Sequence, residues 1–289
     1  MKPAPFEYAD PHSVDEALAV LARHGDDAKV LAGGQSLVPM LNFRLARPAV
    51  VVDVNRIGGL DGLTDADGTL RVGALVRQRR LERWAGDRSP LLAAAMSHVG
   101  HAAIRNRGTV AGSVVHADPA AELPALLLVL DGVVLARSSG QERVIPAPEL
   151  FQGPLMTSLG ADEIVTETRW TLPPATDGWG FHEVARRHGD FALVGAVAVV
   201  GLRAGRLERV RVALFGAGPT ALRMAAVERA LIGQPAAVAM FREAAEAATR
   251  ELDAATDLHA TAGYRRTVGA TLMARALADA AGRAKDQAA

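Results

Sequence analysis

A glycine pair between an apolar stretch and a helical one is the first place where this sequence could do chemistry. Residues 31–36 read Leu-Ala-Gly-Gly-Gln-Ser. Glycines let backbone N–H groups approach an anion closely, because no Cβ intervenes, and the start of a helix adds partial positive charge. Ser36 could cap that helix or donate to a phosphate oxygen. A serine-capped tight turn would look the same, so this loop needs a second one to indicate a phosphate site.

A second segment rich in small residues strengthens the phosphate interpretation. Residues 104–113 read Ile-Arg-Asn-Arg-Gly-Thr-Val-Ala-Gly-Ser, for which a plain surface loop is the alternative. Two such loops within one domain suit a diphosphate held from both sides. Neither contains the lysine of a Walker loop, so the pattern argues against triphosphate chemistry.

A third glycine-bearing turn, residues 216–221, mimics the dinucleotide fingerprint with Gly-Ala-Gly-Pro-Thr-Ala. The strand before it belongs to an antiparallel hairpin rather than to a β-α-β crossover. No strand ending in an acidic residue follows at the spacing that the fingerprint requires. We therefore expect a tight turn into a helix here, and no nucleotide.

Histidine and hydroxyl side chains elsewhere do not indicate a metal or hydrolytic site. His98 and His101 have no third ligand at matching spacing, so we expect no metal ion. Ser113, His116 and Asp118 are close in sequence, but they lack the nucleophile elbow of a hydrolase.

Two carboxylates, Asp118 and Glu122, bracket Pro119 at the start of a predicted helix. Acidic residues at a helix start ordinarily cap it and compensate its dipole. The functional alternative is a carboxylate that accepts hydrogen bonds from a ribityl or ribose hydroxyl group. The residues alone leave both roles open.

The composition restricts the classes of function. The chain has 289 residues, no cysteine, and 32 basic against 32 acidic residues. Zero net charge gives no reason to expect nucleic acid or an anionic membrane as a partner. Without cysteine the chain cannot itself ligate an iron–sulfur cluster. The polar N-terminus does not resemble a signal peptide, and the apolar runs are too short to form an integral membrane segment, so we expect a cytoplasmic protein.

The first glycine loop needs a small α/β unit to position it. Residues 13–16 form a capping box, which predicts a helix with Leu18 and Leu21 on its apolar face. A strand over residues 29–31 leads into the loop, a helix follows over 37–45, and a buried strand over 50–54. We expect residues 1–55 to form a first lobe.

The second loop falls in residues 56–175, which we expect to form the second lobe of the same domain. The pattern predicts strands over 70–74, 132–136 and 164–172, and helices over 75–84, 90–99 and 121–130. Residues 104–119 look irregular, since small and polar residues interrupt any period. Pro173, Pro174 and Gly178 indicate a linker-like turn.

Residues 176–289 are expected to form a separate, smaller α+β domain, because the order of elements changes beyond this linker. Strands over 194–202 and 207–215 form a hairpin, and helices follow over 222–231, 236–252 and 264–281. Apolar residues alternate with Arg209 and Arg211 in the second strand, which predicts one buried and one solvated face.

Five separated motifs resemble, in their order, the medium, FAD-binding subunits of the molybdenum hydroxylases, the family of aerobic carbon monoxide dehydrogenase and the xanthine dehydrogenase-type enzymes. They are LAGGQSL at 31–37, IRNRGTVAGS at 104–113, HADPAAELP at 116–124, RRHGDFALV at 186–194 and GYRR at 263–266. The resemblance covers nearly the whole chain. It implies an α+β fold: a two-lobed FAD-binding domain of the vanillyl-alcohol-oxidase (PCMH) type, then a smaller domain with an antiparallel sheet and C-terminal helices.

By this resemblance, the two glycine loops hold the FAD diphosphate. Glu122 falls where the family has an acidic residue, usually aspartate, near the ribityl chain. Val165 falls near a backbone contact to the isoalloxazine ring. Phe191 falls where a related protein places a tyrosine beside the ring, although an ordinary core phenylalanine is the alternative. The full set of expected FAD contacts is Val30, Leu31, Ala32, Gly33, Gly34, Gln35, Ser36, Leu37, Ile104, Thr109, Gly112, Ser113, Glu122, Val165 and Phe191.

Two residues depart from the family pattern. Gln35 replaces the histidine usual in the carbon monoxide enzymes, and Ala111 replaces a common glycine of the second loop. Both changes should leave FAD binding intact, but they weaken an assignment to carbon monoxide oxidation.

The resemblance also implies partners. A large subunit would hydroxylate the substrate at a molybdopterin centre, and a small subunit would carry electrons through two [2Fe-2S] clusters to FAD on this chain. The acceptor would be a quinone, a cytochrome, oxygen or NAD, and the complex a dimer of heterotrimers. We expect no catalytic acid or base and no metal ligand on this chain.

Two other classes of function stay open. A self-sufficient flavin oxidase or dehydrogenase would need a titratable group at the flavin, for which His182 and His188 are the candidates. A degenerate binding or scaffolding subunit would hold no flavin at all.

Overall fold

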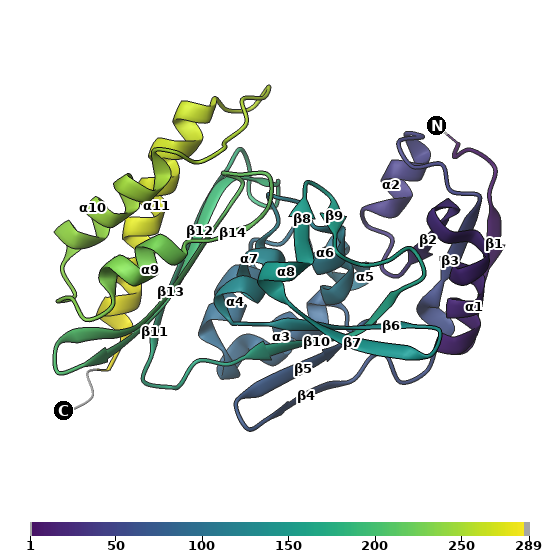
Figure 1. Cartoon of the computed structure of the whole chain (residues 1–289), viewed down its shortest axis with the longest axis horizontal. Coiled ribbons are helices and arrows are strands. Elements are labelled where there is room, and N and C mark those ends of the chain that lie inside the picture. Colours follow the sequence, from purple (N-terminus) through teal and green to yellow (C-terminus); the bar gives the residue numbers. More distant parts are fainter. Residues whose placement is uncertain (1, 286–289) are drawn as a thin grey trace.

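The first lobe is a three-stranded parallel sheet with helices packed on it (Figure 1). The computed structural model describes residues 2–285, and the sheet order is β1-β3-β2. The elements of this lobe are β1 (Glu7–Ala9), α1 (Val14–His24), the 3-10 helix η1 (Gly25–Asp27), β2 (Ala28–Leu31), α2 (Leu37–Asn42), β3 (Val50–Asp53) and the 3-10 helix η2 (Val54–Arg56). Because β2 and β3 run parallel, the glycine loop after β2 lies beside the end of β3.

Helix α1 begins where the capping box predicts. The hydroxyl oxygen of Ser13 accepts a hydrogen bond from the Glu16 N–H at 3.1 Å. The Glu16 carboxylate accepts one from the His12 N–H at 2.8 Å, one residue further upstream than in the usual box. Leu18 and Leu21 are buried beneath this helix, as its apolar period predicts.

The second lobe is a five-stranded antiparallel sheet with the order β4-β5-β10-β6-β7. Its strands are β4 (Leu63–Ala66), β5 (Thr69–Gly73), β6 (Val133–Ser138), β7 (Gln141–Pro146) and β10 (Ile164–Thr171), and β8 (Phe151–Gly153) pairs with β9 (Met156–Thr157). The helices gather on one side of the sheet (Figure 1): α3 (Gln78–Arg88), α4 (Pro90–Met96), α5 (Ala102–Arg107), α6 (Val110–His116), α7 (Glu122–Val129) and α8 (Ala147–Leu150). All residues of α7 are buried, so this helix is the centre of the lobe's core.

The stretch predicted to be irregular, residues 104–119, instead contains α5 and α6. Glycine, serine and β-branched residues have low helix propensity, and the two helices are too short to show a period in the sequence. Tertiary contacts decide their conformation. Thr109 begins α6 by accepting a hydrogen bond from the Gly112 N–H at 3.1 Å.

Two helices differ in their ends from the ranges that the sequence pattern predicts. Helix α3 begins at Gln78 rather than at residue 75, because the Gln78 N–H donates to the Gly108 carbonyl oxygen at 2.9 Å and the preceding residues form a turn. Helix α2 ends at Asn42 rather than at residue 45. Arg44 takes a left-handed conformation with φ 57°, so the helix does not continue through it.

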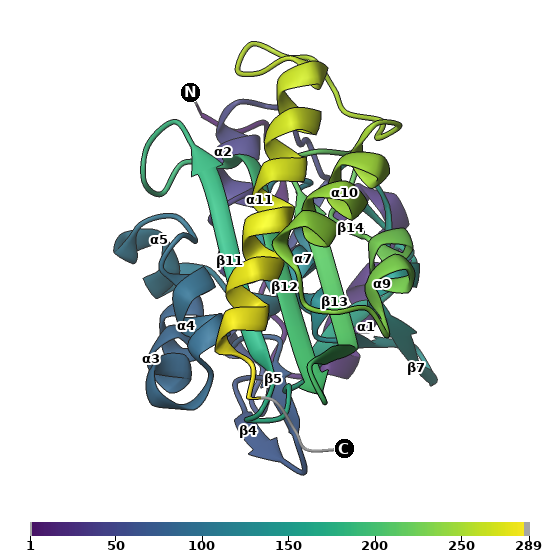
Figure 2. The ribbon, with the colours of Figure 1, turned by 90° about the vertical axis from the view of Figure 1, so that its left-hand side faces the viewer.

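The C-terminal domain is a four-stranded antiparallel sheet, β11-β12-β13-β14, covered by three helices (Figure 2). Its elements are β11 (Gly178–Ala185), β12 (Ala192–Arg203), β13 (Arg206–Phe215), β14 (Leu222–Arg223), α9 (Ala225–Leu231), α10 (Val238–Thr249) and α11 (Ala262–Arg283). The predicted hairpin is present as β12 and β13. The sequence does not predict β11 or β14, because β11 is rich in glycine and polar residues and β14 is only two residues long.

Two glycines allow α11 to lie close against β11. A Cβ on Gly178 would collide with the Ala280 carbonyl oxygen, and one on Gly180 with the Ala276 carbonyl oxygen. Any larger residue would push the helix off the sheet. Within residues 2–285, no helix is both long and apolar enough to cross a membrane.

Both faces of this sheet are covered, so the predicted solvated face of β13 is wrong. Val194 packs with the helices of its own domain, whereas Val197 and Phe215 join the core of the second lobe. Arg211 on the same strand is only partly exposed, and it pairs with Asp131 at 2.7 Å. The alternating arginines predicted water on that face, but they meet carboxylates instead: Arg211 meets Asp131 of the second lobe, and Arg209 meets Asp177 of its own domain.

Candidate functional site

The two glycine loops lie in direct contact, although they belong to different lobes. A Cβ on Gly33 would stand 2.6 Å from the Arg107 carbonyl oxygen, 2.7 Å from Gly108 Cα and 2.9 Å from Thr109 N. These distances leave room for glycine only. The first loop therefore rests on the turn between α5 and α6, which is the arrangement that one shared ligand requires.

The first loop offers backbone donors at the end of β2. Gly34 has a φ of 73°, a left-handed conformation that favours glycine. The N–H groups of Gly34, Gln35 and Ser36 donate no hydrogen bond to any residue in the described part of the chain. The hydroxyl of Ser36 makes no capping bond to α2. An anion at this point would meet three backbone donors and one hydroxyl group.

A cavity of about 350 Å³ opens beside these donors. Its volume lies in the usual range for small-molecule sites, at the carboxyl ends of two parallel strands, where such sites commonly occur. It is lined by Leu31, Ala32, Gly33, Gly34, Gln35, Val38, Pro39, Asp53, Asn55 and Arg107. The cavity is therefore bordered by both loops.

Two polar side chains tie the loops together. Asn55 Nδ2 donates to the Ala32 carbonyl oxygen at 2.8 Å. Arg77 donates to the Arg107 carbonyl oxygen and to Asn55 Oδ1, both at 2.6 Å. One chain of hydrogen bonds thus runs from the first loop to the second and fixes the spacing between them.

Positive charge is concentrated at the loops. Burial, followed by the charge of Arg107, lowers the pKa of Arg77, because two guanidinium groups lie near each other. Burial of Asp53 opposes its ionisation, but hydrogen bonds from Tyr8 and Asn55 keep its pKa below the usual value. Arginine stays protonated, so the two guanidinium groups make this region suitable for a diphosphate.

The second loop is the start of a helix. Thr109 is buried at the beginning of α6, while Gly112 is exposed and Ser113 partly exposed. A Cβ on Gly112 would stand 2.5 Å from Thr109 Oγ1, so a larger residue would displace the capping hydroxyl. The glycine therefore preserves the cap and leaves the helix start open.

Glu122 and Asp118 have different surroundings. Asp118 stabilises the turn before α7 by accepting a hydrogen bond from the Ala120 N–H at 2.9 Å. Glu122 is the first residue of α7 and is only 6% exposed. Burial raises the pKa of Glu122 to about 7, and the charge of Asp118 acts in the same direction. Asp118 thus has the capping role at this helix start.

The other predicted contacts lie on neighbouring elements. Val30 is an exposed residue of β2, and Leu37 is the first residue of α2. Ile104 is exposed on α5. Val165 is buried on β10 beside a β-bulge, so only its backbone could face a ligand. Phe191 is 65% exposed just before β12, which excludes the alternative of a core phenylalanine.

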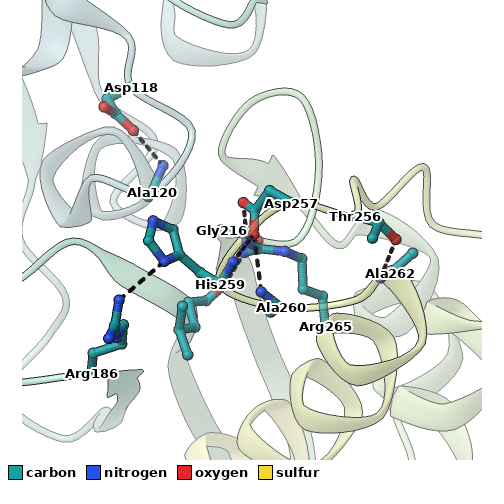
Figure 3. A network of polar contacts seen from close by, with 11 residues as sticks. Asp118, Ala120, Arg186, Gly216, Thr256, Asp257, His259, Ala260, Ala262 and Arg265 are labelled. Atoms are coloured by element: carbon teal, nitrogen blue, oxygen red, sulfur yellow. Dashed lines mark hydrogen bonds and ion pairs between the residues drawn. The ribbon is translucent and has the colours of Figure 1, made fainter.

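The Gly216 turn is occupied by protein atoms. Its N–H donates to the Pro119 carbonyl oxygen at 2.7 Å, and its own carbonyl oxygen accepts from Arg265 at 2.7 Å. Figure 3 shows Arg265 between this turn and Asp257, to which it also donates. The predicted tight turn is present, although β14 and not a helix follows it directly. It fastens the C-terminal domain to the loop before α7.

The histidine pair does not assemble a metal site. Among residues 2–285, no three His, Cys, Asp or Glu side chains are grouped so that they could hold a metal ion. His98 lies against Phe181, with ring centroids 5.1 Å apart, and its Nδ1 is 3.7 Å from Glu183 Oε2. His182, one of the two candidates for a flavin oxidase, instead contacts Asp279 of α11 at 3.1 Å.

Two family models cover most of the chain. Residues 4–171 match the FAD binding domain in molybdopterin dehydrogenase, and residues 179–280 match the CO dehydrogenase flavoprotein C-terminal domain. The chain belongs to this family of FAD-binding flavoproteins. The resemblance predicted from the five motifs is confirmed.

Individual relatives align over almost their full length. The chain is 42% identical to the 6-hydroxypseudooxynicotine dehydrogenase complex subunit alpha of Paenarthrobacter nicotinovorans, over 99% of this chain and 97% of that protein. It is also 42% identical to the caffeine dehydrogenase subunit beta of Pseudomonas sp. (strain CBB1), over 98% and 97%. A solved structure of carbon monoxide dehydrogenase from Hydrogenophaga pseudoflava superposes with a TM-score of 0.95, at 36% identity, over 98% of this chain and 100% of that one. This match confirms the predicted α+β fold.

The geometry of the site fits the cofactor of this family. The close contact at Gly33, the three unengaged N–H groups and the two arginines suit a diphosphate, and the cavity extends from them. FAD supplies one- and two-electron redox chemistry when bound. The side chains described here would hold and orient it.

Several residues of the site are missing from the sequence-based prediction. Asn55 could have been found, because it follows the strand next to β2 and such strand ends meet at one edge. Arg77 carried no such signal, since it joins loops that are distant in sequence. Glu183 is a charged residue within a strand that the sequence does not predict, so its burial could not be anticipated.

Proposed function

We propose that this chain binds FAD between its two lobes and passes electrons from a partner's iron–sulfur clusters to an external acceptor. The diphosphate would lie between residues 32–36 and residues 109–113. The ribityl chain would lie near Glu122, and the ring near Val165 and Phe191. The observation that carries this proposal is the contact of Gly33 with the backbone of the second loop, beside three N–H groups without acceptors.

We further propose that the chain divides near residue 175. Residues 1–175 would form the FAD-binding domain, with lobes at about 1–55 and 56–175, and residues 176–289 the C-terminal domain. The separate sheets support this division. The buried junction at Phe215 indicates that the two domains move as one unit rather than independently.

A comparison of flavins tests the diphosphate contact. Apoprotein would be titrated with FAD, FMN and riboflavin, and binding followed by flavin fluorescence. We expect FAD to bind far more tightly than riboflavin, and ADP to compete with FAD, because the loops recognise the diphosphate. Riboflavin binding as tightly as FAD, without competition by ADP, would contradict the proposed role of the loops.

The partners implied by the family would complete the enzyme. We propose a large molybdopterin subunit and a small subunit with two [2Fe-2S] clusters, arranged with this chain as a dimer of heterotrimers in the cytoplasm. The absence of cysteine supports this division, because the chain has no thiolate for a cluster. Native mass, metal and flavin content of the complex purified from its host would test it. Recovery of an active, metal-free single chain would contradict it.

The substrate is expected to be a nitrogen heterocycle rather than carbon monoxide. Relatives at 42% identity are named for 6-hydroxypseudooxynicotine and caffeine. Gln35, in place of the histidine usual in the carbon monoxide enzymes, supports the same choice. Reduction of the purified complex by a panel of purines and pyridines, with carbon monoxide as the comparison, would decide between them.

A self-sufficient flavin oxidase is the less favoured alternative. His182 points to α11 and is bound to Asp279, and His188 lies in an exposed position. Neither is held in a buried pocket of the FAD-binding lobes. Substrate turnover by the isolated, FAD-loaded chain would be needed to support this function.

A further inference from the structure

A line of titratable side chains leads from the surface toward Glu122 at the junction of the two domains. His98 follows α4, Glu183 lies on β11, and Glu122 begins α7. These elements are distant in sequence and meet only in the folded chain. No role in holding FAD has been assigned above to His98 or Glu183.

Glu183 is the buried member of this line. Its side chain is 3% exposed, and its Oε2 atom has no hydrogen-bond partner among the described residues. The nearest basic group is His98, whose Nδ1 is 3.7 Å from Glu183 Oε2. That distance is slightly longer than a hydrogen bond. A small side-chain rotation would bring the two groups together.

The outer end of the line reaches solvent. The side chain of His98 is 36% exposed, and the ring centroid of His188 lies 6.0 Å from that of His98. His188 itself is exposed. A proton from water therefore has access to His98, and from His98 to the buried carboxyl group.

The charges along the line are not compensated. Burial, followed by the charge of Glu122, raises the pKa of Glu183 to about 8. Burial likewise raises the pKa of Glu122 to about 7, and burial and His188 lower the pKa of His98. The two carboxyl groups are thus held near the pH at which they gain and lose a proton, and the lowered pKa of His98 favours its neutral form, which can accept one.

A second buried carboxylate, that of Asp177, differs from Glu183 because it has a cationic partner. Asp177 is 2% exposed, yet Arg209 donates two hydrogen bonds to it, at 2.6 and 3.1 Å. Its charge is therefore paired. On the other face of β11, His182 contacts Asp279 of α11, so that pair does not face Glu183. The groups that act on Glu183 itself are His98, at 3.7 Å, and Glu122, through its charge. His188 lies beside His98, and Asp118 acts on Glu122.

We propose that His98, Glu183 and Glu122 form a proton path between solvent and the ribityl side of the flavin. The inference rests on the proposed FAD site, because Glu122 is its inner end. Full reduction follows FAD + 2 e⁻ + 2 H⁺ → FADH₂, in which the electrons come from a partner's iron–sulfur clusters and the protons from water. The path releases the same two protons to water when the external acceptor removes the electrons.

Proton uptake during flavin reduction tests this path. The full chain loaded with FAD would be photoreduced without oxygen in weakly buffered solution. Flavin absorbance reports the electrons, and a pH indicator dye reports the protons. We expect Glu183→Gln to retain FAD and to slow proton uptake by about 10- to 100-fold, a range at the lower end of what positioned acids and bases contribute.

His98→Ala provides a second, independent measurement. We expect the same slow proton uptake, restored by added imidazole when the dye response is calibrated at the same imidazole concentration, because a small base can occupy the space that the side chain leaves. A purely structural role of His98 would give no such rescue. His182→Gln is the matched control, since it alters a histidine on the opposite face of the same region of β11 and should leave proton uptake unchanged.

The outcomes separate the two proposals. If the wild-type chain takes up no FAD, the proposed FAD site is wrong and the path fails with it. If FAD binds but both variants take up protons within about twofold of the wild-type rate, the path is wrong and the FAD site stands. Slow uptake in both variants, with imidazole rescue in one, supports the path.

Discussion

The phosphate-loop region and the junction around Glu183 are built on opposite principles. In the loops, backbone N–H groups face a cavity, and the surrounding charges are paired or bridged, as Arg77 is by Asn55 and the Arg107 carbonyl oxygen. At the junction, carboxyl groups are buried without a cation and one oxygen has no partner. The loop region suits a ligand whose negative charge is constant. The junction suits groups whose charge changes as they gain and lose protons.

If the proposed FAD site and proton path are correct, this difference separates cofactor binding from proton supply. A diphosphate keeps its charge at all physiological pH values, so fixed donors suit it. A flavin gains and loses protons with its electrons, so groups that titrate near neutrality suit the surroundings of its ring. The sequence-based expectation that this chain supplies no acid or base stays a prediction for the loops, and the proposed proton path at the junction departs from it.

The largest loss of FAD affinity is expected for Gly33→Val. The new side chain would meet the Arg107 carbonyl oxygen and Thr109 N, which are backbone atoms that cannot move aside freely. Overpacking of this kind costs about 1–3 kcal/mol, or roughly a 5- to 150-fold loss of FAD affinity. FAD titration by fluorescence measures it. Gly112→Val should act in the same direction by displacing the Thr109 cap.

Gly58→Val is the control for these variants. A Cβ on Gly58 meets no atom within 4 Å, so the same change should leave FAD affinity unaltered. The C-terminal domain should stay folded in all three variants, as judged by circular dichroism. Normal flavin occupancy in both loop variants would show that the loops do not hold the diphosphate.

A smaller loss of FAD affinity is expected for Arg77→Met. This change keeps the apolar part of the side chain but removes the hydrogen-bonded bridge between the loops. Hydrogen bonds to charged groups contribute about 1.5–3 kcal/mol each when removed, part of which will appear as lower FAD affinity. Arg77→Lys should recover only part of it, because an ammonium group cannot span both acceptors. Equal FAD affinity in Arg77→Met and wild type would mean that the loops keep their spacing without the bridge.

The sequence predicted one of these regions much better than the other. Glycine, serine and threonine in a strand–loop–helix context mark a backbone site, and such a site needs few distant residues. The helices α5 and α6 were missed because both are short and α6 is rich in glycine, serine and valine, and the turn between them lies within the predicted loop, residues 104–113. The junction combines residues of β11, of α7 and of the segment after α4, and its members become a cluster only when β11 packs against the second lobe. Without the fold, His98 and His101 formed only a histidine pair without a third ligand.

The pH dependence of stability tests the junction directly. A glutamate in the unfolded chain has a pKa near 4.5, whereas burial raises the pKa of Glu183 in the folded chain to about 8. Between these values the folded state holds a proton that the unfolded state has lost. The contribution of Glu183 to the free energy of unfolding is therefore complete below the first value and decreases as pH rises toward the second.

Thermal unfolding of wild type and Glu183→Gln from pH 5 to pH 9 measures this contribution as a difference. The wild-type midpoint should fall by several degrees relative to the variant as pH rises, since about 1 kcal/mol corresponds to a few degrees for a domain of this size. Glu163→Gln is the control, because a hydrogen bond from Arg143 keeps the pKa of Glu163 below its usual value. Parallel curves for wild type and Glu183→Gln would show that Glu183 is ionised throughout.

The smallest effect is expected for Gln35→His, which introduces the residue usual in the carbon monoxide enzymes. Gln35 is exposed, and its side chain only donates to the Gly33 carbonyl oxygen at 3.1 Å. An exposed neutral hydrogen bond contributes about 1 kcal/mol at most, so FAD affinity should change by less than about fivefold. Gln35→Ala should behave in the same way, because the backbone N–H groups are unchanged in both variants. If fluorescence titration instead gives a loss comparable to that of Gly33→Val, the side chain and not the backbone holds the diphosphate, and the contrast between a backbone site and a side-chain site no longer describes this protein.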